Sequence, residues 1–431
     1  MIETGQHAAS QSSQRSPAKM PQLFASLLPG IFLIGYNVGT GSVTAMSKAG
    51  ANFGTDLLWA VLVSCVMTFY LMSLSSRFTM VTGMTLIEGF RRYIHPGFAI
   101  LMMVALSGII LSALIGVLGI IADVLHVWSL TITEGGLSTT LCAGLTATIL
   151  YGLIATGDTA LFEKLLALLV SIMAIAFITT MVTEFPGFSV VLKGLVPKIP
   201  VEAVGSDNNP LVVVAGVVGT TVSVFVLVIR TGLVKEKNWG LEDLKVERRD
   251  AAVSASLMFV VSAAVMITAA ATLYGRGIPL NQISEMIPML EPLFGSFALS
   301  VFVIGIVAAG LSSHLPNLLV IPWIFDDYRG LPRNSKTASK RILLLILSVF
   351  SLIGASFGIK SVFLMLLSQA CISVILPPVL CALAFLTGSA RIMGEQKTGR
   401  KDYFCLLFIL LFAFYMSAQG IRGLILDLTA L

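Results

Sequence analysis

The chain has 431 residues, of which 56% are hydrophobic and only 11% are charged, and its mean hydropathy is +0.95. Soluble domains carry charges on roughly a quarter of their residues, so this composition excludes a soluble globular protein and predicts an all-α polytopic membrane protein. The net charge of +5 can be explained without a nucleic-acid partner, because the lysines and arginines are concentrated in a few loops between apolar segments.

The chain begins with a polar stretch and continues with long apolar segments. Residues 1–20 lack the basic start and short apolar core of a secretory signal, so we predict a disordered cytoplasmic tail. Eleven later segments are long enough to cross a bilayer. They lie near residues 22–48, 56–77, 97–125, 138–157, 161–183, 209–233, 250–273, 294–317, 341–359, 361–386 and 403–421.

The distribution of positive charge predicts the orientation. If the N-terminus is cytoplasmic, 21 of the 27 lysines and arginines fall on cytoplasmic stretches and 6 fall on the other side. Positive residues favour the cytoplasmic side. We therefore predict an integral protein of the plasma membrane, or of a bacterial inner membrane, with a cytoplasmic N-terminus and an extracellular or periplasmic C-terminus.

Two apolar segments are interrupted by small and polar residues near their centres. The first contains GTGSV at 39–43, and the sixth, five segments later, contains GTTVSV at 219–224. A freed carbonyl at membrane depth is tolerated only where it lines a cavity or meets protein partners, and paired interruptions in two halves indicate a transporter site at the repeat interface. Close helix packing by small residues is the alternative interpretation.

Five stretches in register resemble the Nramp family of divalent metal transporters. They are KAGANFGTDLLW (48–59), RFTMVTGMTLIEGFRR (77–92), FEKLLALLVSIMAIAF (162–177), AAGLSS (308–313) and LLSQACISVILPP (366–378). The resemblance implies a LeuT-type fold, with two inverted halves of five helices, broken helices 1 and 6, and one extra helix. We assign 21–190 to the first half, 191–208 to an extracellular loop, 209–388 to the second half, and 389–431 to a cytoplasmic loop and helix 11.

The sequence departs from the family at its two central motifs. The family's Asp-Pro-Gly-Asn aligns with Gly39, Thr40, Gly41 and Ser42, and its Ala-Thr-Val-Met-Pro-His aligns with residues 220–225, which read TTVSVF. The chain therefore resembles a divergent, Nramp-related branch without the carboxylate, thioether and histidine. The resemblance implies a substrate-binding set of Gly39, Thr40, Gly41, Ser42, Thr220, Thr221, Ser223 and Gln369, with metal ligands drawn from Gly39, Ser42, Thr220, Ser223 and Gln369.

Such a site would contain only neutral hydroxyl, amide and carbonyl groups. Three substrates stay open: a partly hydrated ion such as Mg²⁺, a transition metal such as Mn²⁺ or Fe²⁺ held by carbonyls and Gln369, or a monovalent ion or small organic solute. The family resemblance favours secondary-active transport of a divalent cation. A LeuT-fold transporter of a monovalent ion or organic solute is the alternative.

Three ionisable residues are candidates for proton transfer or gating, since charged groups within spans are usually functional. We expect Asp123 at the outer interface as a solvated carboxylate, and His314 near the cytoplasmic end of its span as a solvated or capping side chain. Glu88 stands close to Arg91 and Arg92, which predicts an ion pair at an inner gate or in the scaffold.

No catalytic motif of a soluble enzyme is present. The sequence has no phosphate-binding loop and no His-Glu-x-x-His pattern. We therefore expect no enzyme activity and no cofactor, with the membrane lipid and the transported metal ion or small solute as partners. The sequence leaves open which solute is carried, whether protons are coupled, and the oligomeric state.

Overall fold

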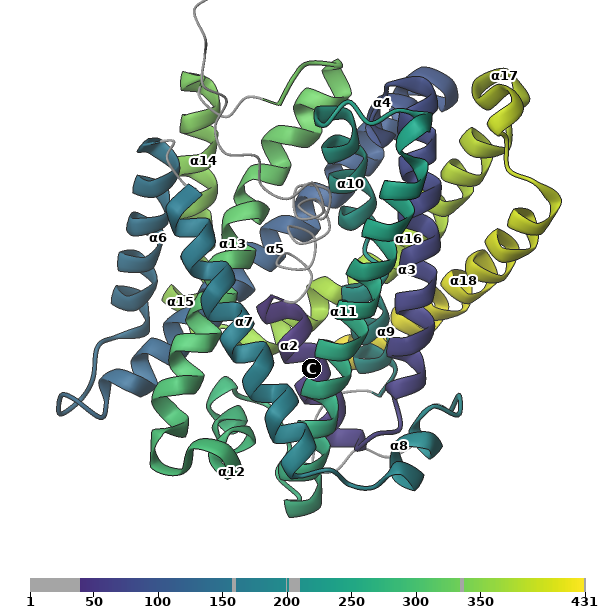
Figure 1. The fold of residues 1–431 in the computed structure, drawn as a ribbon. Helices are drawn as coiled ribbons and strands as arrows, with labels where there is room; N and C mark the ends of the chain where they lie inside the picture. Colours follow the sequence, from purple (N-terminus) through teal and green to yellow (C-terminus); the bar gives the residue numbers. More distant parts are fainter. Residues whose placement is uncertain (1–38, 157–159, 199, 201–209, 334–336, 430–431) are drawn as a thin grey trace, which may run out of the picture.

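The structure is a computed structural model, which describes residues 39–156, 160–198, 200, 210–333 and 337–429. The described chain consists of helices and loops without β-strands. Long helices run side by side between two ends of the molecule (Figure 1). The predicted tail at 1–20 and half of the predicted loop at 191–208 lie outside the described residues.

The first predicted half contains five long helices and several short ones. The long helices are α2 (Thr40–Phe53), α3 (Leu58–Thr82), α5 (Pro96–Ser129), α6 (Thr139–Thr156) and α7 (Ala160–Thr183). The short ones are α4 (Leu86–Gly89), the π-helix η1 (Phe90–Ile94) and α8 (Phe188–Gly194). A bend of 118° separates α7 from α8.

The second predicted half and the C-terminal segment repeat this pattern of long helices. The long helices are α9 (Pro210–Thr221), α10 (Val224–Glu236), α11 (Leu244–Thr272), α13 (Ala298–Arg329), α14 (Ala338–Ser351), α16 (Ser361–Gly388) and α18 (Arg400–Thr429). The short ones are η2 (Leu241–Asp243), η3 (Tyr274–Arg276), η4 (Ile283–Met289), α12 (Glu291–Phe294), η5 (Gly295–Phe297), α15 (Ile353–Ser356), α17 (Ala390–Met393) and η6 (Gly394–Gln396).

Every predicted apolar segment from residue 56 onward coincides with a helix or a broken helix. Within the described ranges, eight helices meet the length and apolarity expected of a span, or nine if the bent α7–α8 pair is one span. This number is below eleven because the apolar part of α6, Thr139–Ile154, is shorter than a full span. In addition, only the end of the first predicted segment is described.

Local sequence signals set where several helices begin and end. His95 caps α5, because its Nδ1 accepts a hydrogen bond from the Gly97 N–H at 3.0 Å and Pro96 occupies the first turn. Gly83 ends α3 with a φ of 67°, a left-handed conformation that glycine adopts at no steric cost. Gly83 therefore sets the turn before α4, and His95 and Pro96 set the turn after η1.

The interrupted helices form the core of the molecule. All fourteen residues of α2 are buried, and so is the whole apolar window of α9 and α10. The α2 helix packs mainly on α11, α9 packs on α16, and α5 lies against both α13 and α16. By contrast, α18 exposes large apolar side chains such as Phe404, which is 75% accessible, as expected of a helix that faces lipid.

The two ends of the molecule differ in charge. The turns with α4 and α17, the end of α10, the end of α13 and the start of α14 lie at one end, whereas α8 and α12 lie at the other (Figure 1). The first end carries the loops rich in lysine and arginine, and we call it the basic end.

Candidate functional site

A helix break separates α9 from α10 in the middle of the bundle. The Val222 N–H still donates to the Val218 carbonyl at 2.8 Å, whereas the Ser223 N–H bonds to no backbone carbonyl of the described chain. Ser223 adopts an extended conformation, with φ −91° and ψ 130°, and its hydroxyl does not cap α10. The interruption expected from GTTVSV is therefore confirmed, and it leaves the Ser223 hydroxyl available to other partners.

The GTGSV stretch marks the start of α2. Gly39 is extended at the N-cap position, with φ −84° and ψ −171°, and its carbonyl accepts the first helical hydrogen bond from Val43 N–H at 3.0 Å. The chain before Gly39 lies outside the described residues.

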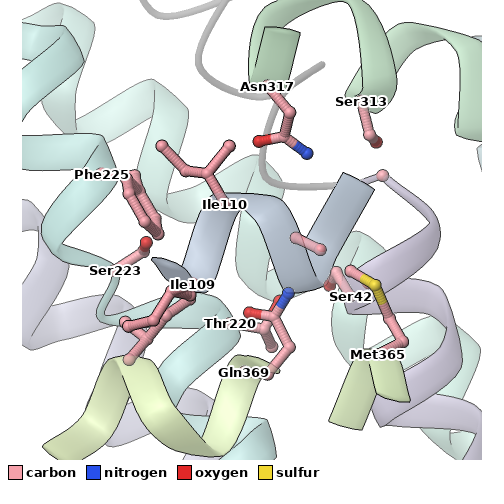
Figure 2. Close-up of a pocket in the computed structure, with 14 residues that line it drawn as sticks. Ser42, Ile109, Ile110, Thr220, Ser223, Phe225, Ser313, Asn317, Met365 and Gln369 are labelled. Carbon is pink, nitrogen blue, oxygen red and sulfur yellow. The ribbon is translucent and has the colours of Figure 1, made fainter. Parts of the chain in front are cut away.

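A small cavity lies where the break and the start of α2 meet α5, α13 and α16. Its volume is about 40 Å³. Its lining residues are Gly39, Gly41, Ser42, Ile109, Ile110, Ala113, Thr220, Ser223, Phe225, Ser313, Asn317, Met365, Gln369 and Ile372. Figure 2 shows Gln369 and Met365 on one side of it and Asn317 and Ser313 on the other.

Six of the eight residues predicted to bind substrate line this cavity, namely Gly39, Gly41, Ser42, Thr220, Ser223 and Gln369. The other two do not. Thr221 donates from Oγ1 to the Val217 carbonyl at 3.1 Å, and its own carbonyl accepts from Thr68 at 2.8 Å. Thr40 is fully buried, and its Oγ1 has no hydrogen-bond partner in the described chain.

Glycines in both motifs allow α16 to approach closely. A Cβ on Gly41 would lie 2.3 Å from Met365 Cε and 2.7 Å from Gln369 Nε2. A Cβ on Gly219 would lie 2.0 Å from the Gln369 carbonyl oxygen. Small residues at helix contacts permit such close packing, which was the alternative interpretation of these glycines. Close packing and the cavity coexist here, because the glycines let α16 approach far enough for Gln369 to line the cavity.

Three polar or polarisable lining residues are absent from the set that the sequence predicts. Ser313 and Asn317 come from α13, and Met365 comes from α16. Residues four apart share a helix face, so the spacing from Ser313 in AAGLSS to Asn317 could have indicated a polar stripe. Met365 precedes Gln369 by the same interval and reaches the cavity for the same reason.

The cavity lining holds no side chain that is charged at neutral pH. Moreover, no group of three or more His, Cys, Asp or Glu residues in the described ranges could hold a metal ion. The N-termini of α2 and α10 and the C-terminus of α9 border the cavity. Helix N-termini attract negative charge and C-termini attract positive charge, so the backbone field there is mixed. Any cation would rely on neutral oxygens.

The candidate proton residues lie outside the cavity lining. His314 is fully buried in α13, and neither ring nitrogen has a partner among the described residues, so the expected solvated or capping histidine is wrong. Asp123 is half-buried near the end of α5, where the Ser361 hydroxyl donates to its carboxylate. The carboxylate that we expected to be solvated is thus only partly accessible, and it has a hydrogen-bond partner.

Glu88 forms an ion pair at the basic end, although not with its neighbours in sequence. Its carboxylate accepts from Lys235 Nζ of α10 at 2.9 Å, while Arg91 lies over the ring of Tyr328 and Arg92 over that of Tyr93. The prediction of an ion pair is confirmed, and the predicted partner is wrong.

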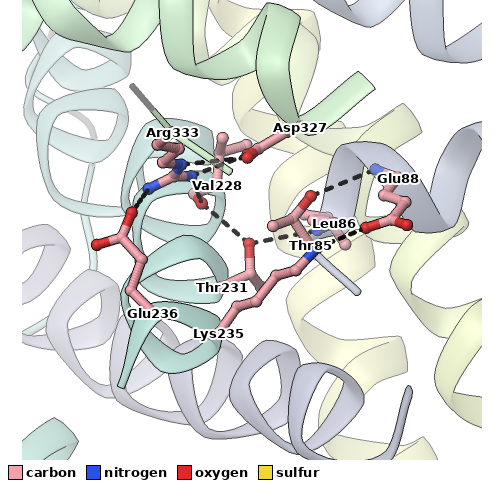
Figure 3. Close-up of polar contacts among 9 residues, drawn as sticks. All are labelled: Thr85, Leu86, Glu88, Val228, Thr231, Lys235, Glu236, Asp327 and Arg333. Atoms are coloured by element: carbon pink, nitrogen blue, oxygen red, sulfur yellow. Dashed lines mark hydrogen bonds and ion pairs between the residues drawn. The ribbon is translucent and has the colours of Figure 1, made fainter. Parts of the chain in front are cut away.

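Figure 3 shows a second polar link next to this pair. Arg333 donates to both carboxylate oxygens of Asp327, at 3.1 and 2.8 Å, and to the Val228 carbonyl of α10 at 3.4 Å. The side chains of Arg333 and Asp327 are only 5% and 2% exposed. Together with Glu88 and Lys235 they join α4, α10 and α13, so we call these four residues the basic-end network.

The fold and the cavity define a class of protein. A helical membrane protein with a cavity at a broken central helix has the architecture of a secondary transporter. Solved structures share this fold: a manganese transporter of Eremococcus coleocola has a TM-score of 0.73 at 17% identity, covering 97% of this chain and 92% of that one. The nucleobase-cation-symport-1 family transporter Mhp1 has a TM-score of 0.59 at 16% identity, covering 97% and 95%. The fold is of the LeuT type.

The chain belongs to the Nramp family. The sequence model of that family, described as natural resistance-associated macrophage protein-like, matches residues 30–421. A divalent metal cation transporter MntH of Yersinia pestis is 27% identical over 366 residues, which cover 83% of this chain and 85% of the relative. A protein of the same name from a Nostoc species is 27% identical over 386 residues, covering 85% and 84%.

Proposed function

We propose that this protein is a secondary-active transporter of a divalent metal cation of the Mn, Fe or Mg type, and that the cation passes through the neutral cavity. The family and the names of the relatives support the substrate class: the curated relatives are divalent metal cation transporters, and a structural neighbour is a manganese transporter. The position of the cavity in the middle of the helix bundle supports a role in transport and not in catalysis.

The size of the cavity is the observation that carries the proposal. A single buried water needs roughly 10–15 Å³ of such space, so about 40 Å³ accommodates one ion with a few waters. Pockets for organic ligands are usually about 300–1,000 Å³. The alternative substrate, a small organic solute, is therefore disfavoured, and a monovalent ion is left as the competitor.

Neutral oxygen donors would replace part of the hydration shell of the ion. Hydroxyls of Ser42, Thr220 and Ser223, together with the amide of Gln369, supply hard ligands, which suit Mg²⁺ and Mn²⁺. The Met365 thioether adds one softer atom to the lining. Since no carboxylate compensates the charge, we expect weak binding of an ion that keeps several of its waters.

We also propose an orientation in a plasma membrane or bacterial inner membrane, with the basic end and the N-terminus cytoplasmic and the C-terminus on the other side. The concentration of lysine and arginine at one end supports this orientation. Cysteines introduced as His7→Cys and Leu431→Cys should react with an impermeant thiol reagent from inside and from outside, respectively. Labelling of the first from outside would overturn the orientation.

Uptake into proteoliposomes tests the function. The purified chain is reconstituted and offered Mn²⁺, Mg²⁺, Na⁺ or an amino acid, and Gly41→Leu serves as the control because its side chain would collide with Met365 and Gln369. We expect uptake of at least one divalent cation by the native chain only. Uptake of Na⁺ or an amino acid without divalent cation uptake would contradict the proposal.

A further inference from the structure

A second cavity at the basic end is separate from the transport site. Its volume is about 300 Å³, and it opens between α3, the start of α11 and the start of α18. Its lining residues are Phe69, Tyr70, Ser73, Leu74, Arg77, Leu244, Lys245, Glu247, Arg248, Gln396 and Asp402. Phe69, Ser73 and Arg77 follow one another at intervals of four and therefore share one face of α3.

The charge in this cavity is predominantly positive. Arg77, Lys245 and Arg248 all line it. Of the two acids present, Glu247 is fully buried and already paired with Arg230 at 3.0 Å. Asp402 approaches Arg77 only at 3.5 Å. Three cations therefore face one carboxylate that is available to them, which leaves an excess of positive charge for an anionic ligand.

One face of α3 brings Ser73 and Arg77 to the cavity. Ser73 Oγ and Arg77 Nε are themselves enclosed by protein and have no hydrogen-bond partner among the described residues, so they are not the atoms that a ligand in the cavity would meet. The Arg77 side chain is nevertheless 22% exposed. A guanidinium close to two further cationic side chains suits the oxygens of a phosphate group.

The cavity also lies where a lipid headgroup would lie. Asp402, in the first turn of α18, lines it, and Phe404, two residues further along α18, is largely exposed. Basic pockets at this level between transmembrane helices bind anionic headgroups. Phe69 and Leu74 provide apolar contacts beside the three cations.

We propose that this cavity binds the phosphate group of an anionic lipid, with Arg77, Lys245 and Arg248 as the cationic contacts. Phosphatidylglycerol is the probe that we would use. The proposal is independent of the transported ion, because none of these residues lines the central cavity.

Two adjacent arginines provide a matched test. Arg248 lines the cavity, whereas Arg249 is also exposed and does not line it. Native mass spectrometry of the full-length chain in mild detergent would measure binding of phosphatidylglycerol and of phosphatidylcholine with the same acyl chains. We expect Arg248→Gln to weaken phosphatidylglycerol binding about tenfold, as for the loss of one charge-assisted contact, and Arg249→Gln to leave it unchanged. Arg77→Gln should weaken it at least as much.

Two further comparisons distinguish an anionic lipid from a free phosphate and from nonspecific lipid binding. Equal affinity for phosphatidylcholine, or equal effects of Arg248→Gln and Arg249→Gln, would overturn the proposal. Competition by inorganic phosphate at the same concentrations as phosphatidylglycerol would also overturn it and would assign the cavity to a free phosphate. Because Arg248 is exposed, its substitution leaves the fold intact, so a lost signal cannot be attributed to unfolding.

Discussion

Gln369 is the residue on which the transport cavity depends most directly. Gln369 lines the cavity. Gly41 and Gly219 lie directly against it, and a side chain at either position would collide with it. We predict that Gln369→Ala weakens divalent cation binding about ten- to a hundredfold, because one lost contact in a dehydrated site costs about 1–3 kcal/mol. Calorimetric titration with Mn²⁺ measures this. Ser368→Ala is the control, since Ser368 donates within its own helix to the Met365 carbonyl at 2.8 Å. Equal losses in both variants would contradict the role of Gln369.

Gly39 offers a gain-of-function test at the same scale. Aspartate is a preferred N-cap residue and is stabilised at a helix N-terminus, so Gly39→Asp should be tolerated at the start of α2. A carboxylate about 4 Å from a divalent ion contributes about 2 kcal/mol even at the dielectric constant of water. We therefore predict that the Mn²⁺ affinity rises at least about tenfold. The neutral Gly39→Asn should change it little, and an unchanged affinity in Gly39→Asp would place the ion elsewhere.

At the scale of elements, the basic-end network ties the half-helix α10 to α13 and α4. Arg333→Gln leaves Asp327 buried without its partner, and removal of one partner from a buried pair costs about 3–5 kcal/mol. We predict that this change opens the path between the basic end and the cavity. Ser223→Cys should then react faster with a thiol reagent applied from that end than it does without Arg333→Gln. Arg329→Gln, an exposed neighbour in the same turn, should leave the rate unchanged, and an unchanged rate in Arg333→Gln would remove the network from gating.

The helices also differ in how well the sequence predicts them and their contacts. Long apolar segments such as 361–386 predicted α16, and GTTVSV predicted the break before α10, because both signals are local. The partner of Glu88 could not be predicted in this way, since Lys235 is 147 positions away. The burial of His314 was missed for a related reason: an apolar segment does not show which helix face meets protein and which meets lipid.

At the scale of the whole molecule, the absence of ionisable groups from the cavity lining bears on proton coupling. None of the lining residues titrates near neutral pH, and His314 and Asp123 lie outside the lining. We predict that divalent cation uptake by proteoliposomes changes less than about twofold between about pH 5.5 and about pH 7.5, a range that only a histidine would normally sense. A steep dependence that disappears in His314→Ala or Asp123→Asn would contradict this prediction and assign the proton to that residue.

The position of the bound cation in the molecule can be observed directly. Crystals of the full-length protein soaked in Mn²⁺ would show the ion through its anomalous scattering, independently of any functional assay. We expect a peak in the central cavity, in contact with Gln369 and at least one of the hydroxyls of Ser42, Thr220 and Ser223. Peaks only beside carboxylates elsewhere, with the central cavity empty at saturating Mn²⁺, would contradict it.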